Sequence, residues 1–160
     1  DMPQRKIHVL ARENLPALSY KAPIAIHHED MVGLTGGKMS SSIPNSRIMI
    51  DETPENIRKK ISMAFCPEKQ TKDNPILQIC RYIIFPREEK IKIERPAKHG
   101  GNHEFKNYSN LEEAYSAGRL HPLDLKNAVA QSLIKILEPV RKQMSQKRIL
   151  ELKKMIKGMD

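Results

Sequence analysis

Hydrophobic residues recur three and four positions apart over most of the chain, and this spacing predicts a largely helical protein. One apolar stripe ends at Leu15, just before Pro16, and predicts a short first helix. The β-branched residues Ile24 and Ile26, at alternate positions, predict a strand at 22–27, and a second short strand is predicted at 47–50. Residues 29–47 are rich in glycine and serine, so we expect a long polar loop there. The predicted order is helix, strand, loop, strand, and then several helices.

Three longer helices are predicted by the residues at which they begin. Thr53-Pro54, Asn74-Pro75 and Pro122 each place a proline in the first helical turn, where its missing N–H is not needed. The residues expected to face the core are Ile57, Ile61, Ala64 and Phe65 in the first helix, Ile76, Ile79, Cys80 and Ile83 in the second, and Leu125, Val129, Leu133, Ile136 and Val140 in the third. Pro139 is expected to kink the third helix or to split it in two.

Shorter signals complete the pattern in the second half of the chain. Residues 90–94 alternate charged residues and isoleucine, which predicts a short edge strand or an extended arm. Ser109 and Glu112 have the spacing of a capping box, and Gly118 is placed to end the brief helix that they would begin. A final basic helix is expected at residues 145–158.

Composition and charge narrow the class of function. Lysine and arginine outnumber aspartate and glutamate by 28 to 19, and residues 141–160 alone hold seven of these cations against two carboxylates. Charge gathered in one element favours a polyanion partner, although a solvated helical face has the same composition. No apolar run approaches the roughly 20 residues of a membrane span, so no membrane partner is expected. Cys66 and Cys80 are too few for a disulfide scaffold, and buried thiols in a reducing cytoplasm are expected.

The chemistry of the chain concentrates in the polar loop. Its run Gly36-Gly37-Lys38-Met39-Ser40-Ser41-Ser42 places one ammonium and three hydroxyls on a glycine stem, a combination that can surround phosphate oxygens. The run is not a Walker A loop, because that motif requires other residues where Val32 and Met39 stand. Taken alone, it is also compatible with an ordinary polar loop. No metal site is predicted at His27-His28-Glu29-Asp30, since successive strand residues point in opposite directions.

Several segments together resemble one family. Lys38-Met39-Ser40-Ser41-Ser42 is similar to the KMSKS signature of class I aminoacyl-tRNA synthetases, in a KMSSS form. The surrounding segments resemble the archaeal and eukaryotic tyrosyl-tRNA synthetases over residues 2–143. Those segments are Gln4-Arg5-Lys6-Ile7-His8, Gly33-Leu34-Thr35-Gly36, Arg58-Lys59-Lys60-Ile61, Ala64-Phe65-Cys66 and His121-Pro122-Leu123-Asp124-Leu125-Lys126-Asn127.

The resemblance implies a fold in two parts, α/β followed by all-α. Residues 1–52 would be the end of a Rossmann-type catalytic domain with the KMSKS loop, and residues 53–160 a helical anticodon-binding domain with a basic C-terminal helix. The implied protein is a cytoplasmic tyrosine–tRNA ligase that uses ATP with Mg²⁺, joins tyrosine to tRNA(Tyr), and forms a homodimer at full length. The family's HIGH motif does not occur in these 160 residues, so we expect a C-terminal piece that is inactive alone.

The resemblance also implies roles for residues of the first part. Lys38-Met39-Ser40-Ser41-Ser42 would bind the ATP phosphates and stabilise the charge that builds on the leaving pyrophosphate. Ser41 stands where a second lysine is usual, so Lys38 and Mg²⁺ would have to neutralise more of the pyrophosphate charge. Gln4 would contact tyrosine near its α-amino group, and Pro3 stands where an acidic residue is common.

In the second part, three residues match positions that read the first anticodon base, a guanine in tyrosine tRNA. Asp124 would accept hydrogen bonds from the guanine Watson–Crick edge, His121 would lie beside the base, and His99 would stack on it. The cations of residues 141–157 would contact phosphates. On the residues alone, a helix-capping role for Asp124 and ordinary surface histidines are the simpler explanation.

Two alternatives remain open at this stage. Tryptophanyl-tRNA synthetases share the fold and a similar loop, and the residues that select the amino acid lie outside these segments. The second alternative is a non-catalytic RNA-binding module that uses only the helical part, and it predicts RNA binding that is indifferent to the anticodon.

Overall fold

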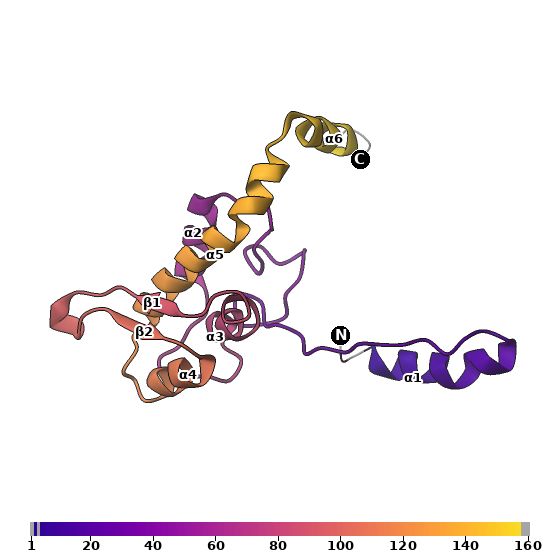
Figure 1. Ribbon diagram of the computed structural model, residues 1–160, viewed down its shortest axis with the longest axis horizontal. Helices are drawn as coiled ribbons and strands as arrows, with labels where there is room; N and C mark the ends of the chain where they lie inside the picture. The colour runs from indigo at the N-terminus through magenta and orange to yellow at the C-terminus, as the bar shows by residue number, and fades with distance from the viewer. Residues whose placement is uncertain (1, 3, 158–160) are drawn as a thin grey trace. The chain divides into compact units, whose positions relative to one another are not determined.

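The computed structural model describes residues 2 and 4–157, without the side chains of His99, Lys154 and Lys157. The chain forms two compact units, Asp1–Met31 and Val32–Asp160 (Figure 1). Each unit is described by itself. The domain boundary predicted at residue 52 stays a prediction.

The first unit contains one helix and an extended segment. Helix α1 is Arg5–Asn14, and a 3-10 turn, η1, follows it at Leu15–Leu18. The predicted first helix is therefore confirmed. At Pro16 the chain continues as the 3-10 turn. Pro3 lies outside the described residues. No described residue of α1 or η1 is buried.

The prediction of a strand at 22–27 is wrong, because these residues form neither a strand nor a helix. The side chains of Ile24 and Ile26 are 95% and 88% exposed, and this segment has no strand partner within the described chain. An alternating pattern favours an extended backbone, but a strand forms only where a second strand accepts its hydrogen bonds.

The strand predicted at 47–50 is also wrong, for a different reason. The carbonyl oxygen of Arg47 accepts a hydrogen bond from the Lys60 ammonium, and the N–H of Met49 donates to the Glu52 carboxylate. The side chains of Glu52, just before the next helix, and of Lys60, within it, therefore form the backbone hydrogen bonds that a neighbouring strand would have formed.

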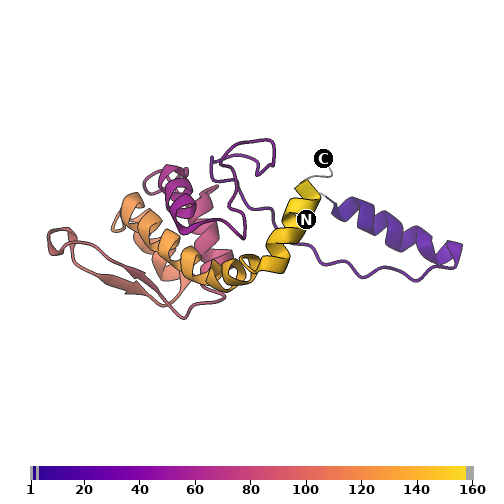
Figure 2. The same cartoon turned by 90° about the horizontal axis from the view of Figure 1, so that it is seen from above.

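Helices build the second unit. Helix α2 is Pro54–Met63, α3 is Pro75–Ile79, α4 is Tyr108–Ser116, α5 is Pro122–Met144 and α6 is Lys147–Lys157. The predicted starts of α2 and α3 are confirmed, because Thr53 accepts from the N–H of Asn56 and Asn74 accepts from the N–H groups of Ile76 and Leu77. Helices α2 and α5 pack side by side (Figures 1 and 2).

A π-helical turn, η2 at Cys80–Ile84, continues α3 and changes which isoleucine is buried. The N–H of Phe85 bonds to the carbonyl of Cys80, five residues back. The extra residue in the turn rotates the chain, so Ile84 is buried and Ile83, the predicted core residue, is only half-buried.

The predicted strand at 90–94 is confirmed as β1, Ile91–Ile93. It pairs with β2, His103–Phe105, in an antiparallel two-stranded sheet, with Ile91 opposite Phe105. A 3-10 turn, η3 at Ala97–His99, lies in the connection between the strands. The side chains of Ile91, Ile93 and Phe105 are buried, so the hairpin packs one face onto the helices.

The prediction of a capping box at Ser109 and Glu112 is wrong. Helix α4 begins earlier, because the Asn107 side chain accepts from the N–H of Asn110, and Glu112 instead accepts a bond from the Tyr108 hydroxyl at 2.8 Å. Gly118 ends the helix as predicted, with φ at +74°, in the left-handed region that glycine tolerates.

Helix α5 continues through Pro139 without being split. Leu125, Val129 and Leu133 are buried as predicted, whereas Ile136 and Val140 are half-buried. After a short break, α6 turns away from the α5 axis (Figures 1 and 2). Lys153 of α6 pairs with Asp51, so this cation already has a carboxylate partner.

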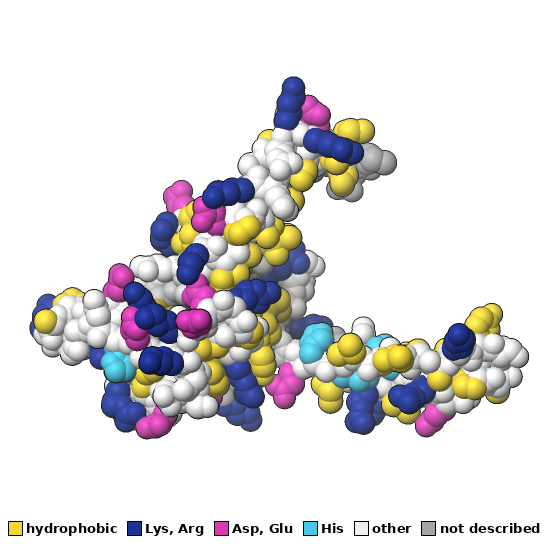
Figure 3. Space-filling view, viewed as in Figure 1, with side chains coloured by type: hydrophobic (Ala, Val, Ile, Leu, Met, Phe, Trp, Pro, Cys, Tyr) yellow, Lys and Arg dark blue, Asp and Glu magenta, His cyan; other side chains and the backbone are white. Residues whose placement is uncertain are grey.

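Both α6 and the first unit carry exposed hydrophobic side chains, as does the rest of the second unit (Figure 3). The exposed residues of α6 are Leu150, Leu152, Met155 and Ile156. Among the described residues, no helix is both long enough and apolar enough to cross a membrane. Cys66 and Cys80 are free thiols, but only Cys80 is buried, and its burial raises its pKa well above the usual range.

Candidate functional site

The run from Val32 to Ser46 folds into a tight hairpin-like loop. Val32 and Lys38 form an antiparallel bridge, and the N–H of Gly33 donates to the carbonyl of Gly37 at 2.7 Å. Gly36 has φ at +86°, and a Cβ atom there would lie only 2.7 Å from Cγ of Phe65. Glycine is therefore required at position 36, both by the backbone conformation and by the neighbouring ring.

A buried serine closes the other side of this loop. The Ser46 hydroxyl donates to the carbonyl of Ser40 at 2.7 Å and accepts from the N–H of Ser40 at 3.2 Å, and its side chain is 0% exposed. The carbonyl of Ser46 also accepts from the N–H of Leu34 at 2.8 Å. Ser46 was not predicted from the sequence, because a serine at the end of a serine-rich loop has no distinguishing pattern.

The closed loop presents the signature side chains to solvent. Lys38, Met39, Ser41 and Ser42 are exposed and Ser40 is half-buried. Within the described chain the Lys38 ammonium makes no hydrogen bond or ion pair, whereas the hydroxyls of Ser40 and Ser42 bond to each other at 2.9 Å. The result is an uncompensated cation beside hydroxyl donors on a shaped backbone, which is an arrangement suited to an anion.

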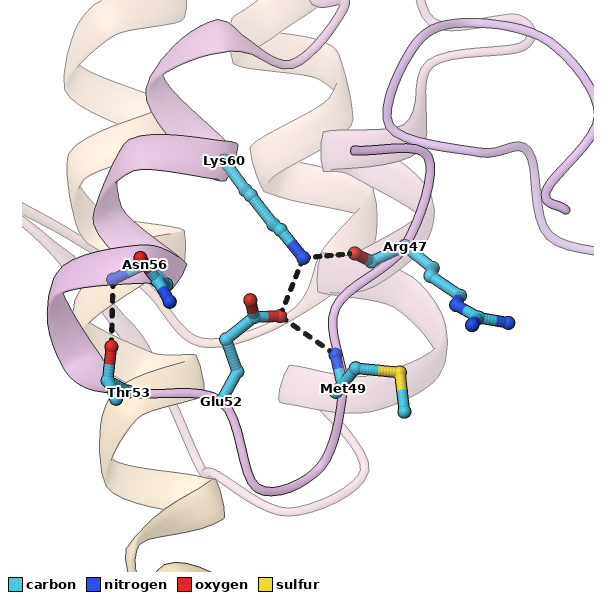
Figure 4. Close-up of polar contacts among 6 residues, drawn as sticks. All are labelled: Arg47, Met49, Glu52, Thr53, Asn56 and Lys60. Carbon is cyan, nitrogen blue, oxygen red and sulfur yellow. Dashed lines mark hydrogen bonds and ion pairs between the residues drawn. The ribbon is translucent and has the colours of Figure 1, made fainter. Parts of the chain in front are cut away.

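A polar network ties the segment after the loop to helix α2 (Figure 4). The Lys60 ammonium lies 2.8 Å from the Glu52 carboxylate and 3.0 Å from the carbonyl of Arg47. The same carboxylate accepts from the N–H of Met49 at 3.0 Å. Both charged side chains are largely buried, so this pair holds the stem of the loop firmly on α2.

Gln4 lies in the first unit, at the exposed start of α1. Its carbonyl accepts hydrogen bonds from the N–H groups of Ile7 and His8, so it caps the helix through its backbone. Its predicted contact with tyrosine stays a prediction. His27-His28-Glu29-Asp30 lies in the same unit, and no group of metal-ligating side chains is assembled among the described residues.

His121 and Asp124 lie together in the first turn of α5. The Nδ1 atom of His121 accepts from the N–H of Leu123 at 3.1 Å, and its Nε2 atom lies 3.5 Å from the Glu68 carboxylate. His121 thus takes the capping role that the sequence alone suggested for Asp124. The half-buried Asp124 carboxylate makes no hydrogen bond within the described chain, so its oxygens are available to a ligand.

Arg95 connects the hairpin loop with the start of α5. Its side chain donates to the carbonyl of Gly101 at 2.9 Å and to that of Arg119 at 3.1 Å, and its own N–H donates to the Asn102 side chain. The loop that contains His99 is thereby tied to the segment that leads into His121, although the His99 side chain lies outside the described residues. No role for Arg95 was predicted from the sequence.

Comparison with known proteins decides the family. Residues 3–138 match the sequence profile of a family described as tRNA synthetases class I (W and Y). The chain belongs to this class I tRNA synthetase family.

Relatives of this synthetase chain point to the tyrosine branch. It is 52% identical over 141 residues to a tyrosine–tRNA ligase from Methanospirillum hungatei, covering 88% of the chain and 44% of that relative. A crystal structure of tyrosyl-tRNA synthetase with L-tyrosine from Archaeoglobus fulgidus superimposes with a TM-score of 0.83 at 48% identity, covering 89% of this chain and 44% of that one. The chain therefore spans less than half the length of these relatives.

The tryptophan alternative has weaker support among the class I synthetases. A tryptophanyl-tRNA synthetase from Giardia lamblia superimposes with a TM-score of 0.61 at 21% identity, which shows a shared fold only. A tyrosyl-tRNA synthetase from Aeropyrum pernix reaches 0.83 at 41% identity, over 98% of this chain and 46% of that one.

Proposed function

We propose that this chain is the C-terminal part of a tyrosine–tRNA ligase. It would supply the KMSSS loop to the active site and read the anticodon of tRNA(Tyr). The full-length protein would join tyrosine to ATP as tyrosyl-adenylate and pass the tyrosyl group to the tRNA. The observation that carries this proposal is the solvent-facing Lys38 ammonium, which has no partner in the described chain and stands on a loop closed by Ser46.

In the first step, the tyrosine carboxylate would attack the α-phosphorus of ATP, and the bond from that phosphorus to the pyrophosphate oxygen would break. Negative charge then builds on the departing pyrophosphate. Lys38 and the hydroxyls of Ser40–Ser42 would stabilise that charge more strongly in the transition state than in bound ATP. The groups that the loop exposes fit a triphosphate, and Mg²⁺ bound with ATP would share its phosphate charge.

The finer assignments belong to the same proposal. Residues 1–52 would complete a Rossmann-type catalytic domain in which Gln4 contacts tyrosine, and residues 53–160 would form the anticodon-binding domain. The full-length protein would be a homodimer. The isolated chain is expected to form no tyrosyl-adenylate, because it spans 44% of the length of a tyrosine–tRNA ligase relative and does not contain the family's HIGH motif.

Lys38→Ala tests the catalytic half of the proposal. In the full-length protein, this change should lower kcat for tyrosine-dependent ATP–pyrophosphate exchange by about 10²–10³, the usual loss for one transition-state donor, with little change in KM for tyrosine. Lys72→Ala, at an exposed lysine outside the loop, is the matched control. An unchanged kcat would refute the role of Lys38.

Asp124→Ala tests the recognition half. The change should weaken binding of a tRNA transcript with guanine at the first anticodon position by about 1–3 kcal/mol, as expected for loss of base-edge hydrogen bonds. Transcripts with another base at that position should bind both proteins about equally. Equal weakening for all transcripts would instead support the non-catalytic RNA-binding alternative.

A further inference from the structure

A groove runs along helix α5 between helix α2 and strand β1. It consists of two adjoining cavities of about 440 and 530 Å³. Both are lined by Lys92 and Glu94 of the hairpin and by Ala128 and Gln131 of α5. The shared lining makes the two cavities one continuous groove with α5 as its floor.

The first cavity carries an excess of positive charge. Four cations line it, Arg58, Lys59, Lys92 and Lys126, against the single carboxylate of Glu94. The side chains of Arg58 and Lys59 make no hydrogen bond or ion pair within the described chain. The Lys126 ammonium donates to the carbonyl of Ser62 at 3.0 Å, which leaves its charge uncompensated.

The second cavity is closer to neutral. The Lys135 ammonium lies 3.0 Å from the Glu88 carboxylate, and the hydroxyl of Ser132 donates to the same carboxylate at 2.9 Å. Lys90 pairs with Glu104 at 2.7 Å. Anion binding should therefore concentrate at the α2 end of the groove.

The groove begins next to the residue proposed to read the anticodon. On a helix, residues three or four positions apart share a face. Asp124, Asn127, Ala128 and Gln131 follow this spacing, and the last three line the first cavity. A nucleotide whose base reaches Asp124 would thus have its neighbouring phosphates beside the cavity that Arg58 and Lys59 line.

We infer that this groove binds the backbone phosphates of the RNA strand adjoining the first anticodon base, with Arg58 and Lys59 as its principal cations. The inference rests on the proposed function for the identity of the RNA. It assigns phosphate contacts to α2, beside the anticodon-reading residues, and not to the basic helix α6, where Lys153 already pairs with Asp51.

The test measures binding of two stem-loop RNAs to the 160-residue chain over a series of salt concentrations, one with guanine and one with another base at the first anticodon position. The doubly neutralised variant Arg58→Gln/Lys59→Gln should bind about 25- to 60-fold more weakly at 0.1 M salt, and the log–log salt slope should fall by about 1.4–1.8. Lys72→Gln/Lys106→Gln removes the same charge from exposed positions outside both cavities and serves as the control. Glu94→Gln removes the single carboxylate of the first cavity and should tighten binding.

The outcomes separate this inference from the proposed function. If the groove variant and the control weaken binding equally, only net charge matters and the inference is overturned. Retained preference for guanine together with an unchanged salt slope in the groove variant would overturn the inference while leaving the proposed function intact. If the groove variant lowers the slope but no base preference exists, the groove is upheld and anticodon reading fails. Weaker binding by Glu94→Gln would also count against the groove.

Discussion

At the scale of single residues, the geometry of the signature loop depends on side chains outside the signature. Ser46 satisfies both the N–H and the carbonyl of Ser40 from a fully buried position, and Gly36 accommodates the ring of Phe65. Lys38 and Ser41 meanwhile remain exposed, free to contact a ligand. Ser46 and Gly36 thus fix the conformation of the loop, whereas Lys38 and Ser41 provide its exposed charge and hydrogen-bond donor.

Ser46→Ala should loosen the loop without unfolding the second unit. Losing two hydrogen bonds at Ser40 should cost about 1–2 kcal/mol of local stability, so the amide of Ser40 should exchange with solvent about 5- to 30-fold faster. Native-state hydrogen exchange by NMR measures this rate. Ser62→Ala removes an exposed hydroxyl that bonds only within α2 and should leave the Ser40 amide unchanged. Equal rates in wild type and Ser46→Ala would show that Ser46 does not close the loop.

Tyr115 provides a residue-scale test at alkaline pH. Its buried hydroxyl donates to the carbonyl of Pro67 at 2.7 Å and contacts the thiol of Cys66 at 3.1 Å. Burial, and then the hydrogen bond with Cys66, raises the pKa of Tyr115 above its usual value near 10. Because the folded state holds the proton more tightly, this contribution to stability is complete below about pH 10 and is lost as pH rises through the folded-state pKa.

Tyr115→Phe should therefore lower stability by about 1–2 kcal/mol at neutral pH, because the Pro67 carbonyl loses its donor. Above about pH 10 the difference should shrink, since only the wild type has this ionisation to oppose folding. Urea unfolding of both proteins from pH 7 to 11 measures the trend. Tyr108 and Cys80, whose pKa values burial also raises, are present in both proteins and cancel. A difference that grows with pH would contradict this account.

At the scale of elements, the second unit is held together by helices whose register is set partly by their neighbours. The π-turn at Cys80–Ile84 brings Ile84 inward, where a regular helix would bury Ile83. Strand β1 exists because β2 pairs with it across the loop that Arg95 ties to the start of α5.

The π-turn makes a prediction for two adjacent isoleucines. Ile84→Ala should lower the free energy of unfolding by about 2–5 kcal/mol, because it empties a fully buried site. Ile83→Ala, the matched change at a half-buried position, should cost only about 1 kcal/mol. Urea denaturation of the two variants gives both values. The reverse order would show that the helix keeps a regular register through Ile84.

At the scale of the whole molecule, the two units differ in what stabilises them. The second unit has a continuous apolar core, whereas α1 and η1 have no buried residue among those described. A helix of 10 residues with no buried side chain is marginal in water. The exposed Ile7, Leu10, Ile24 and Ile26 therefore contribute no core to the isolated chain.

Hydrogen exchange of the isolated chain should separate the units. Amides of α1 should exchange within about tenfold of an unstructured peptide, whereas central amides of α5 should be protected by about 10³-fold or more. Mass spectrometry of peptic fragments after deuterium labelling measures both regions at once. Comparable protection of α1 and α5 would show that the first unit is stabilised by packing that the described contacts do not include.

The amino-acid sequence by itself determined the helices, the polar loop and the family resemblance. Thr53, Asn74 and Gly118 act through bonds and backbone conformations within a few residues, so their effects can be read locally. Tertiary structure alone decided the features that need distant partners. Residues 22–27 and 47–50 have no strand partner within the described chain, and Ile84 is buried in place of the predicted Ile83. Ser46 and Arg95 form hydrogen bonds with backbone groups that only folding brings near them. A hydrogen bond to a distant residue leaves no periodic trace in the sequence, and for that reason these residues were found only in the folded chain.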